Sequence, residues 1–146
     1  DCDLRKPSQH TIFELKNEQG FVNIVLQEGA LTKYIQQAVK GLWVLTSGPM
    51  PPNPSEIITL SKTKEFWTKE FITFDYILID SPPVLPVADP VLLSSQIDGV
   101  LLVLESSCRV ETALEAESRL SKAGANIVGV VLNKVKLRKT YYSYYN

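Results

Sequence analysis

The sequence lacks any run of about 18 uninterrupted apolar residues, which a membrane-spanning helix would need. Its first residues, Asp1 to Arg5, do not form the basic segment followed by an apolar one that directs export. Basic residues number 15 against 16 acidic ones, so a broad cationic face for nucleic acid is not expected. From these absences we expect no membrane span, no secretory leader and no nucleic-acid partner.

Cysteine and histidine are also scarce. Cys2 and Cys108 show no metal-ligand spacing, and a single pair does not make a disulfide framework. We therefore expect a reducing cytosol, with both thiols structural or incidental. The single histidine, His10, lies in a polar segment where a surface position is favoured over catalysis.

The apolar residues that are present, 45% of the 146, fit one globular domain with one core and a single sheet. Four short runs are rich in Val, Ile and Leu and are bounded by Gly, Pro, Asp or Asn. They cover residues 42–45, 76–79, 100–104 and 127–132. This pattern is typical of parallel strands that are buried on both faces.

A helix is predicted between the third and fourth runs. Apolar residues recur there at helical spacing, at Val110, Ala113, Leu114, Leu120 and Ala123. Gly124 follows as a C-terminal stop. Strand, helix and strand then form a right-handed βαβ unit, which makes the fold class α/β with a parallel sheet flanked by helices.

Two proline-rich loops follow predicted strands, at residues 49–54 and 82–90. In open parallel sheets, ligands bind beyond the carboxyl ends of the strands, so both loops are placed where chemistry is expected. Pro54, Ser55 and Glu56 favour the start of a helix, and residues 61–71 are expected to continue as helix.

Three carboxylates and an arginine are the candidate site residues. Asp80 ends an apolar run, which would place a magnesium-binding carboxylate at a strand tip or merely begin a turn. On an extended strand Asp1 and Asp3 would project to the same side, with Arg5 next in that row. Arg5 could hold phosphate oxygens or simply neutralise the two acids.

The last residues differ in composition from the rest. Basic side chains at Lys134, Lys136, Arg138 and Lys139 precede Tyr141, Tyr142, Tyr144 and Tyr145. We expect a flexible tail over residues 136–146, which could carry tyrosines into an active site or pack on the surface.

Several motifs together resemble those of the bacterial tyrosine kinases that control capsule and exopolysaccharide synthesis. Asp1-Cys2-Asp3-Leu4-Arg5-Lys6-Pro7 is similar to their second Walker-type motif, and Phe74-Asp75-Tyr76-Ile77-Leu78-Ile79-Asp80-Ser81-Pro82-Pro83 to their Walker B motif. Residues 45–56 resemble their characteristic loop and helix start. Val87-Ala88-Asp89, Asp98-Gly99-Val100, residues 129–135 and the closing tyrosines follow in the family's order.

The resemblance implies a P-loop fold related to the MinD and ParA ATPases, which binds ATP and Mg²⁺ and transfers the γ-phosphoryl group to tyrosine. Asp1 would activate the tyrosine hydroxyl and support magnesium indirectly, Asp3 would assist at the metal, and Asp80 would bind magnesium through water. Arg5 would stabilise charge near the phosphates. Asn133 and Lys134 could approach the base, or form a plain strand-end turn.

The resemblance also implies a cellular setting. Autophosphorylation is expected among Tyr141, Tyr142, Tyr144 and Tyr145. Other expected partners are a membrane-embedded polysaccharide co-polymerase or activator, protein tyrosine substrates, and further copies that assemble through an N-terminal segment outside this sequence. The protein would lie in the cytoplasm at the inner face of the membrane, held there by a partner or an upstream segment.

One motif of the family is missing. No Gly-x-x-x-x-Gly-Lys-[Ser/Thr] occurs, so the phosphate cradle, its lysine and its magnesium-binding hydroxyl are not in this sequence. We interpret residues 1–135 as the C-terminal part of a kinase domain that is truncated at its N-terminus and inactive, or nearly so, alone. Two alternatives stay open: a MinD-like or ParA-like ATPase, and a non-catalytic module that binds a partner or serves as a kinase substrate.

Overall fold

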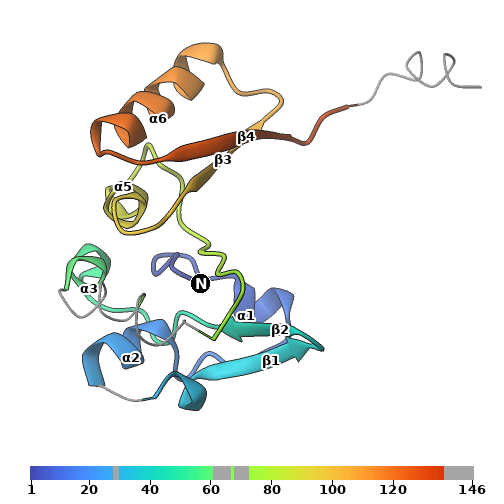
Figure 1. The fold of residues 1–146 in the computed structure, drawn as a ribbon, viewed down its shortest axis with the longest axis vertical. Helices are drawn as coiled ribbons and strands as arrows, with labels where there is room; N and C mark the ends of the chain where they lie inside the picture. The colour runs from blue at the N-terminus through green and yellow to red at the C-terminus, as the bar shows by residue number, and fades with distance from the viewer. Residues whose placement is uncertain (28–29, 61–66, 68–72, 137–146) are drawn as a thin grey trace, which may run out of the picture.

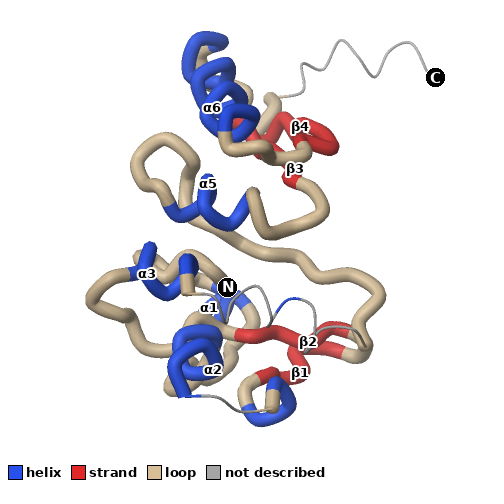
Figure 2. Tube along the Cα trace, turned by 60° about the vertical axis from the view of Figure 1, so that its left-hand side comes forward, coloured by secondary structure: helices blue, strands red, loops and turns tan. Residues whose placement is uncertain are grey.

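The structure is a computed structural model that describes residues 1–27, 30–60, 67 and 73–136. Its helices are α1 (Gln9–Ile12), α2 (Phe21–Gln27), the 3-10 helix η1 (Leu31–Lys33), α3 (Pro54–Thr59), α5 (Asp89–Ser94) and α6 (Val110–Lys122). Its strands are β1 (Ile35–Val39), β2 (Leu42–Leu45), β3 (Val100–Glu105) and β4 (Ile127–Asn133). The two pairs of strands lie toward opposite ends of the molecule, with α3 and α5 between them (Figures 1 and 2).

The predicted βαβ unit is confirmed. Strands β3 and β4 are parallel neighbours, and α6 connects them. Gly124 follows the helix at a φ of +77°, the left-handed conformation in which glycine ends helices without steric cost. The α/β class is therefore carried by residues 100–133.

The strand predicted at residues 42–45 is present as β2, but its parallel pairing was wrong. It pairs antiparallel with β1, and only two residues separate the two strands. Gly41, at a φ of +84°, permits this tight turn. A connection this short cannot make the crossover that parallel strands require.

The strand predicted at residues 76–79 was also wrong, because the structure assigns no strand there. A strand needs a hydrogen-bonded neighbour, and the described residues supply only a backbone bond from the Cys2 N–H to the Asp80 carbonyl, at 2.8 Å. The expected single sheet is consequently two separate sheets of two strands each.

Two clusters of buried side chains replace the single predicted core. The larger contains Leu4, Phe21, Ile58 and Leu93 among others, and joins the N-terminal segment to α2, α3 and α5. The smaller contains Leu102, Ala116 and Leu120, and packs α6 on β3. The N–H at Nη1 of Arg119 in α6 donates to the Leu85 carbonyl at 2.7 Å, which ties this second cluster to the preceding loop.

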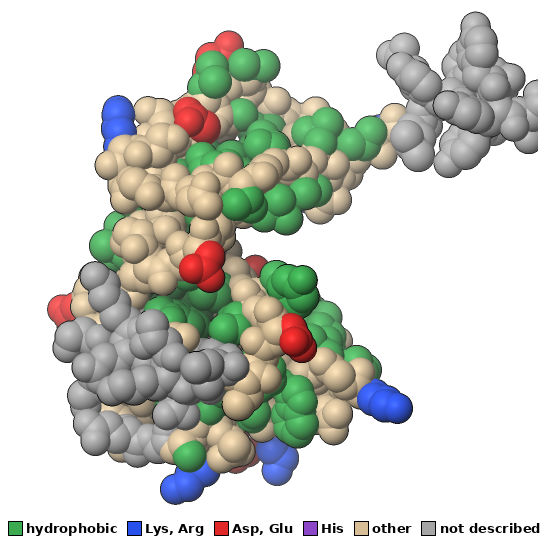
Figure 3. All heavy atoms as spheres, in the orientation of Figure 1, with side chains coloured by type: hydrophobic (Ala, Val, Ile, Leu, Met, Phe, Trp, Pro, Cys, Tyr) green, Lys and Arg blue, Asp and Glu red, His purple; other side chains and the backbone are tan. Residues whose placement is uncertain are grey.

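The expectation that the strands are buried on both faces was wrong. In β3, Leu102 is 7% exposed, whereas Leu101 and Val103 are 57% and 56% exposed. Helix α6 covers only one side of the pair, so the other side has no element packed on it within the described residues. Figure 3 shows hydrophobic side chains along this open side, next to a hollow in the middle of the molecule.

Candidate functional site

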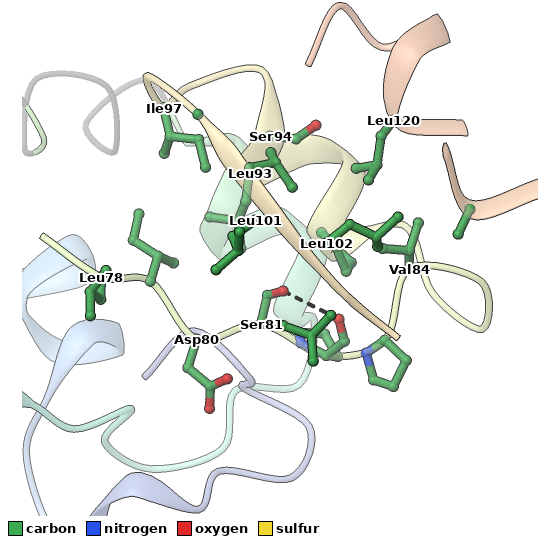
Figure 4. A pocket seen from close by; sticks show the side chains of 18 of the residues that line it. Leu78, Asp80, Ser81, Val84, Leu93, Ser94, Ile97, Leu101, Leu102 and Leu120 are labelled. Carbon is green, nitrogen blue, oxygen red and sulfur yellow. Dashed lines mark hydrogen bonds between the residues drawn. The ribbon is translucent and has the colours of Figure 1, made fainter. Parts of the chain in front are cut away.

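Two cavities flank the extended segment that ends at Asp80. The first, of about 1000 Å³, lies between residues 77–81 and β3. The second, of about 690 Å³, lies between residues 74–80 and β2. In Figure 4 the Asp80 side chain points away from Leu101 and Leu102, toward the N-terminal segment. The segment thus presents its terminal carboxylate in an open, concave part of the molecule.

Gln9 connects the two carboxylates that the sequence placed in one site. Its side-chain amide donates to Asp80 Oδ2 at 2.6 Å, and its backbone N–H donates to Asp1 Oδ2 at 3.0 Å. The backbone nitrogen of Asp1 in turn donates to the Leu45 carbonyl at the end of β2, at 2.9 Å. The structure therefore brings Asp1 and Asp80 together, and Gln9, which sequence reasoning missed, makes the link.

Asp1 and Asp3 do not project from an extended strand as predicted. The chain bends at residues 4–6, and both carboxylates turn back to accept backbone N–H groups. Asp1 accepts from Asp3, Ser8 and Gln9 at 3.0 to 3.2 Å. Asp3 accepts from Arg5 and Lys6 at 3.1 and 2.9 Å. Short polar side chains often bind nearby backbone in this way, which shapes a loop and competes with strand formation.

Arg5 pairs with neither Asp1 nor Asp3, but with Asp89 in the first turn of α5. Its Nε and Nη2 groups donate to the two oxygens of the Asp89 carboxylate at 2.6 and 3.2 Å. The Ser55 hydroxyl, at the start of α3, donates to the same carboxylate at 2.5 Å. Sequence reasoning assigned no role to Ser55 or Asp89, and burial of a carboxylate is not visible in a sequence.

The electrostatics of this contact favour the charged forms of both partners. Burial by itself would raise the pKa of Asp89, but the hydrogen bonds from Arg5 and Ser55 and the guanidinium charge outweigh it, so the pKa lies below its usual value. The bond to Asp89 correspondingly raises the pKa of Arg5. The pair is therefore ionised at neutral pH.

A buried polar network holds the base of the first proline-rich loop. Thr46 and Ser47 are 0% and 1% exposed. The Thr46 hydroxyl donates to the carbonyl of Gln19 at 3.1 Å, and Asn17 bonds to Ser47 and to the backbone N–H of Gly48 at 3.2 and 2.8 Å. Asn17 gave no sequence signal, whereas Ser47 and Gly48 lie within residues 45–56, which resemble the family's loop.

Asn133 and Lys134 lie apart from these groups. Neither lines the cavities beside Asp80. The Asn133 side chain accepts the backbone N–H of Lys134 at 2.8 Å, and the Lys134 ammonium pairs with Glu105. The structure thus places them at the end of β4 without joining them to the carboxylates.

Magnesium would find only part of a ligand set among the described residues. Among the residues that the structure describes, no group of three His, Cys, Asp or Glu side chains is placed to hold a metal ion by itself. Mg²⁺ is commonly bound by one or two carboxylates together with phosphate oxygens and water. Asp80 and Asp1, linked through Gln9, fit that mode of binding.

The remaining sequence predictions concern thiols, the membrane and the tail. Both cysteines are free, and burial raises the pKa of Cys2 to about 11, which keeps it an unreactive thiol. No helix in the described part of the chain has the length and apolar character to cross a membrane. The four tail tyrosines and the helix predicted over residues 61–71, apart from Trp67, lie outside the described residues.

Solved structures with this fold place the chain in a class. It aligns with the VpsO kinase domain at a TM-score of 0.87 and 32% identity, covering 93% of this chain and 68% of that one. It aligns with the kinase domain of the Escherichia coli tyrosine kinase ETK at a TM-score of 0.89 and 32% identity, covering 96% of this chain and 56% of that one. These likenesses place the chain among α/β proteins with the P-loop NTPase fold.

Sequence relatives narrow this class to a family. The tyrosine-protein kinase YwqD of Bacillus subtilis is 37% identical over 99% of this chain and 62% of its own length. The tyrosine-protein kinase Etk of Escherichia coli is 36% identical over 99% of this chain and 20% of its own length. No protein-family model matches. The chain belongs to the bacterial tyrosine-kinase family, as its motifs predicted, and spans about two thirds or less of these relatives.

Proposed function

We propose that this chain is the C-terminal part of an ATP-dependent protein-tyrosine kinase that regulates capsular or exopolysaccharide synthesis and export. The observation that carries the proposal is the link from Asp80 through Gln9 to Asp1, in a chain that belongs to the tyrosine-kinase family. Phosphoryl transfer depends on positioning and on the neutralisation of charge, and carboxylates with a bound cation supply both.

Each residue has a defined part in this proposal. Magnesium bound with ATP neutralises charge on the phosphates. Asp80 and Asp1 would hold it, and Asp3, two residues from Asp1, would assist. Asp1 already accepts three backbone N–H groups, so one of its roughly four acceptor positions is left for a tyrosine hydroxyl. Arg5 would stabilise charge near the phosphates, and Asn133 and Lys134 would lie nearer the base.

In this proposal the phosphate-binding loop comes from outside these residues, because the sequence contains no Gly-Lys-Ser or Gly-Lys-Thr motif. The cavity of about 1000 Å³ between residues 77–81 and β3 is where a further parallel strand would fit, since the outer edge of β3 has no neighbour in the described sheets. We infer that an N-terminal segment enters there, and that the chain alone transfers phosphate slowly or not at all.

The proposal extends to partners and location. The substrates would be protein tyrosines, including Tyr141, Tyr142, Tyr144 and Tyr145 of this chain, which would form a flexible tail over residues 136–146. Assembly with further copies would use the N-terminal segment. A membrane-embedded polysaccharide co-polymerase would activate the kinase at the inner face of the membrane.

The test is the intact mass of the gene's full-length product before and after incubation with magnesium and ATP. Wild type should gain phosphate on tail peptides, and Asp80→Ala should not. Asp75→Ala is the matched control, because this exposed carboxylate lies on the same segment. If wild type gains no mass, the kinase proposal fails, and a non-catalytic binding or substrate module takes its place.

A further inference from the structure

Asp89 is a buried carboxylate to which the proposed mechanism gives no part. Its side chain is 1% exposed, and each of its oxygens accepts a hydrogen bond from Arg5. Ionised carboxylates are rarely buried without a partner, because loss of water disfavours the charge. A bidentate pair with a guanidinium compensates for that loss and also fixes the angle of both groups.

The contact joins three segments that lie far apart in the sequence. Arg5 belongs to the loop shaped by Asp1 and Asp3, and Ser55 is the second residue of α3, directly after the first proline-rich loop. Asp89 is the first residue of α5, near the end of the second proline-rich loop. The Arg5 Nη2 group also lies 3.4 Å from the Ser55 hydroxyl, so the three side chains form a closed triangle. All three loops are consequently held at one point.

The arginine is left with free donor capacity. Within the described residues, Asp89 and Ser55 occupy Nε and Nη2 of Arg5, and no partner occupies Nη1. The side chain is 40% exposed, so this nitrogen can meet a ligand from solvent. A guanidinium held on one edge by a carboxylate presents its other edge in a fixed direction, as recognition of phosphate oxygens requires.

We propose that Asp89, held by Ser55, is a positioning residue that acts through Arg5 and directs its free edge toward the phosphoryl group in transfer. The choice of a phosphoryl group as the ligand rests on the function proposed above. The arrangement of Arg5, Ser55 and Asp89 does not depend on that function. A lysine at position 5 could not replace the arginine, because an ammonium lacks the planar fork that binds both oxygens.

The geometry is tested on this chain by nuclear magnetic resonance of the Arg5 Nε–H group. In wild type it should give a resonance shifted from those of exposed arginines and slow to exchange with water. Asp89→Asn should remove that shift, whereas Asp98→Asn, at an exposed carboxylate on the same chain, should keep it. An Arg5 resonance in wild type like that of exposed arginines would overturn the proposal, whether or not the protein is a kinase.

The positioning role is tested by a mutant cycle in the gene's full-length product. Asp89→Asn should lower kcat by about tenfold to a hundredfold, as the loss of an orienting partner commonly does, with the KM for ATP nearly unchanged. Arg5→Ala should lower kcat by at least as much, and the double variant no further than Arg5→Ala alone. If instead the losses in kcat of the two single variants multiply in the double variant, Asp89 does not act through Arg5.

Ser55→Ala covers the case in which Asp89→Asn fails to fold. It removes one hydrogen bond and leaves the ion pair, so kcat should fall between wild type and Arg5→Ala. Its matched control is Ser95→Ala, because within the described part of the chain the Ser95 hydroxyl bonds only to the Leu92 carbonyl, one turn before it, at 3.0 Å. Equal kcat values for the two serine variants would contradict the role of Ser55. If wild type transfers no phosphate, the proposed function fails and the resonance test decides the geometry.

Discussion

At the scale of the residue, Gly20 lies where no side chain fits. A Cβ atom there would lie 2.1 Å from the Thr46 carbonyl oxygen and 2.4 Å from the Gly48 nitrogen. Both are backbone atoms that the buried network around Thr46 holds in place. Gly20→Ala should therefore lower the free energy of unfolding by about 3 kcal/mol, measured by urea denaturation, because the backbone must move to admit the methyl group.

Gly129→Ala is the control for this prediction. The nearest heavy atom to its added Cβ is the Leu101 Cδ1 at 3.4 Å, an ordinary contact with a side chain that can move. We expect a change of less than about 1 kcal/mol. Equal losses for the two variants would show that the close approach of Gly20 to Thr46 does not constrain the fold.

The buried ion pair predicts how stability depends on acid. Because the Asp89 pKa is lower in the folded protein than in the unfolded chain, its stabilisation is complete above about pH 4. It is lost as the pH falls through the lower, folded-state pKa. Denaturation of wild type across pH 2 to 6 should show this loss.

The comparison for the acid dependence is Asp89→Asn, which should be less stable at neutral pH and should show a shallower fall. Glu105, whose pKa the Lys134 ammonium lowers, titrates in the same range in both proteins, so the difference between the curves isolates Asp89. Parallel curves would contradict the assignment.

Residue types could be predicted at this scale, but their partners could not. The motifs singled out Asp1, Asp3, Arg5 and Asp80, and the structure joins Asp1 to Asp80. The partner of Arg5 is 84 positions away, so no local pattern points to it. Gln9 escaped notice because a glutamine in a polar segment has no distinctive spacing.

At the scale of the element, α6 depends on a narrow buried stripe. Leu120 is 1% exposed, whereas Leu114, on the same predicted stripe, is 60% exposed. Leu120→Ala should lower the free energy of unfolding by about 3 kcal/mol, since it leaves a cavity between α6 and β3. Leu114→Ala should change it by less than about 0.5 kcal/mol. Similar values for the two variants would mean that another element covers Leu114 in solution.

Elements were predictable where their signals are local. Helix α6 shows helical spacing and a closing glycine, and β3 and β4 are short apolar runs on either side of it. The pairing of a strand depends on which strand lies beside it and in which direction. The local sequence of one strand does not show either. Residues 76–79 have the composition of a strand, yet the described residues place no ladder beside them. For the same reason, the apolar composition of β3 and β4 did not reveal that one face of this strand pair is exposed.

At the scale of the whole molecule, the extended segment before Asp80 should be less protected from exchange than the strands. Its flanks are two cavities, and Tyr76 and Leu78 are 89% and 93% exposed. Amide hydrogens at residues 77–79 should exchange with solvent about a hundredfold faster than those within β3 and β4, because they lack a ladder. Hydrogen exchange followed by mass spectrometry measures this.

Concentration provides the control for the exchange experiment. Protection at residues 77–79 that rises with protein concentration would show that a second copy pairs with this segment. Strong protection at low concentration would contradict the open arrangement.

The long separation between Arg5 and Asp89 has a consequence for synthesis. A ribosome adds about 5 to 20 residues per second, so Arg5 precedes its partner, 84 positions on, by about 4 to 17 seconds. During that delay the carboxylates of Asp1 and Asp3 can already accept the backbone N–H groups beside them, as they do in the finished structure. The loop over residues 1–8 can thus take its local shape early during synthesis. Its docking onto α5 follows later, after Asp89 has been added.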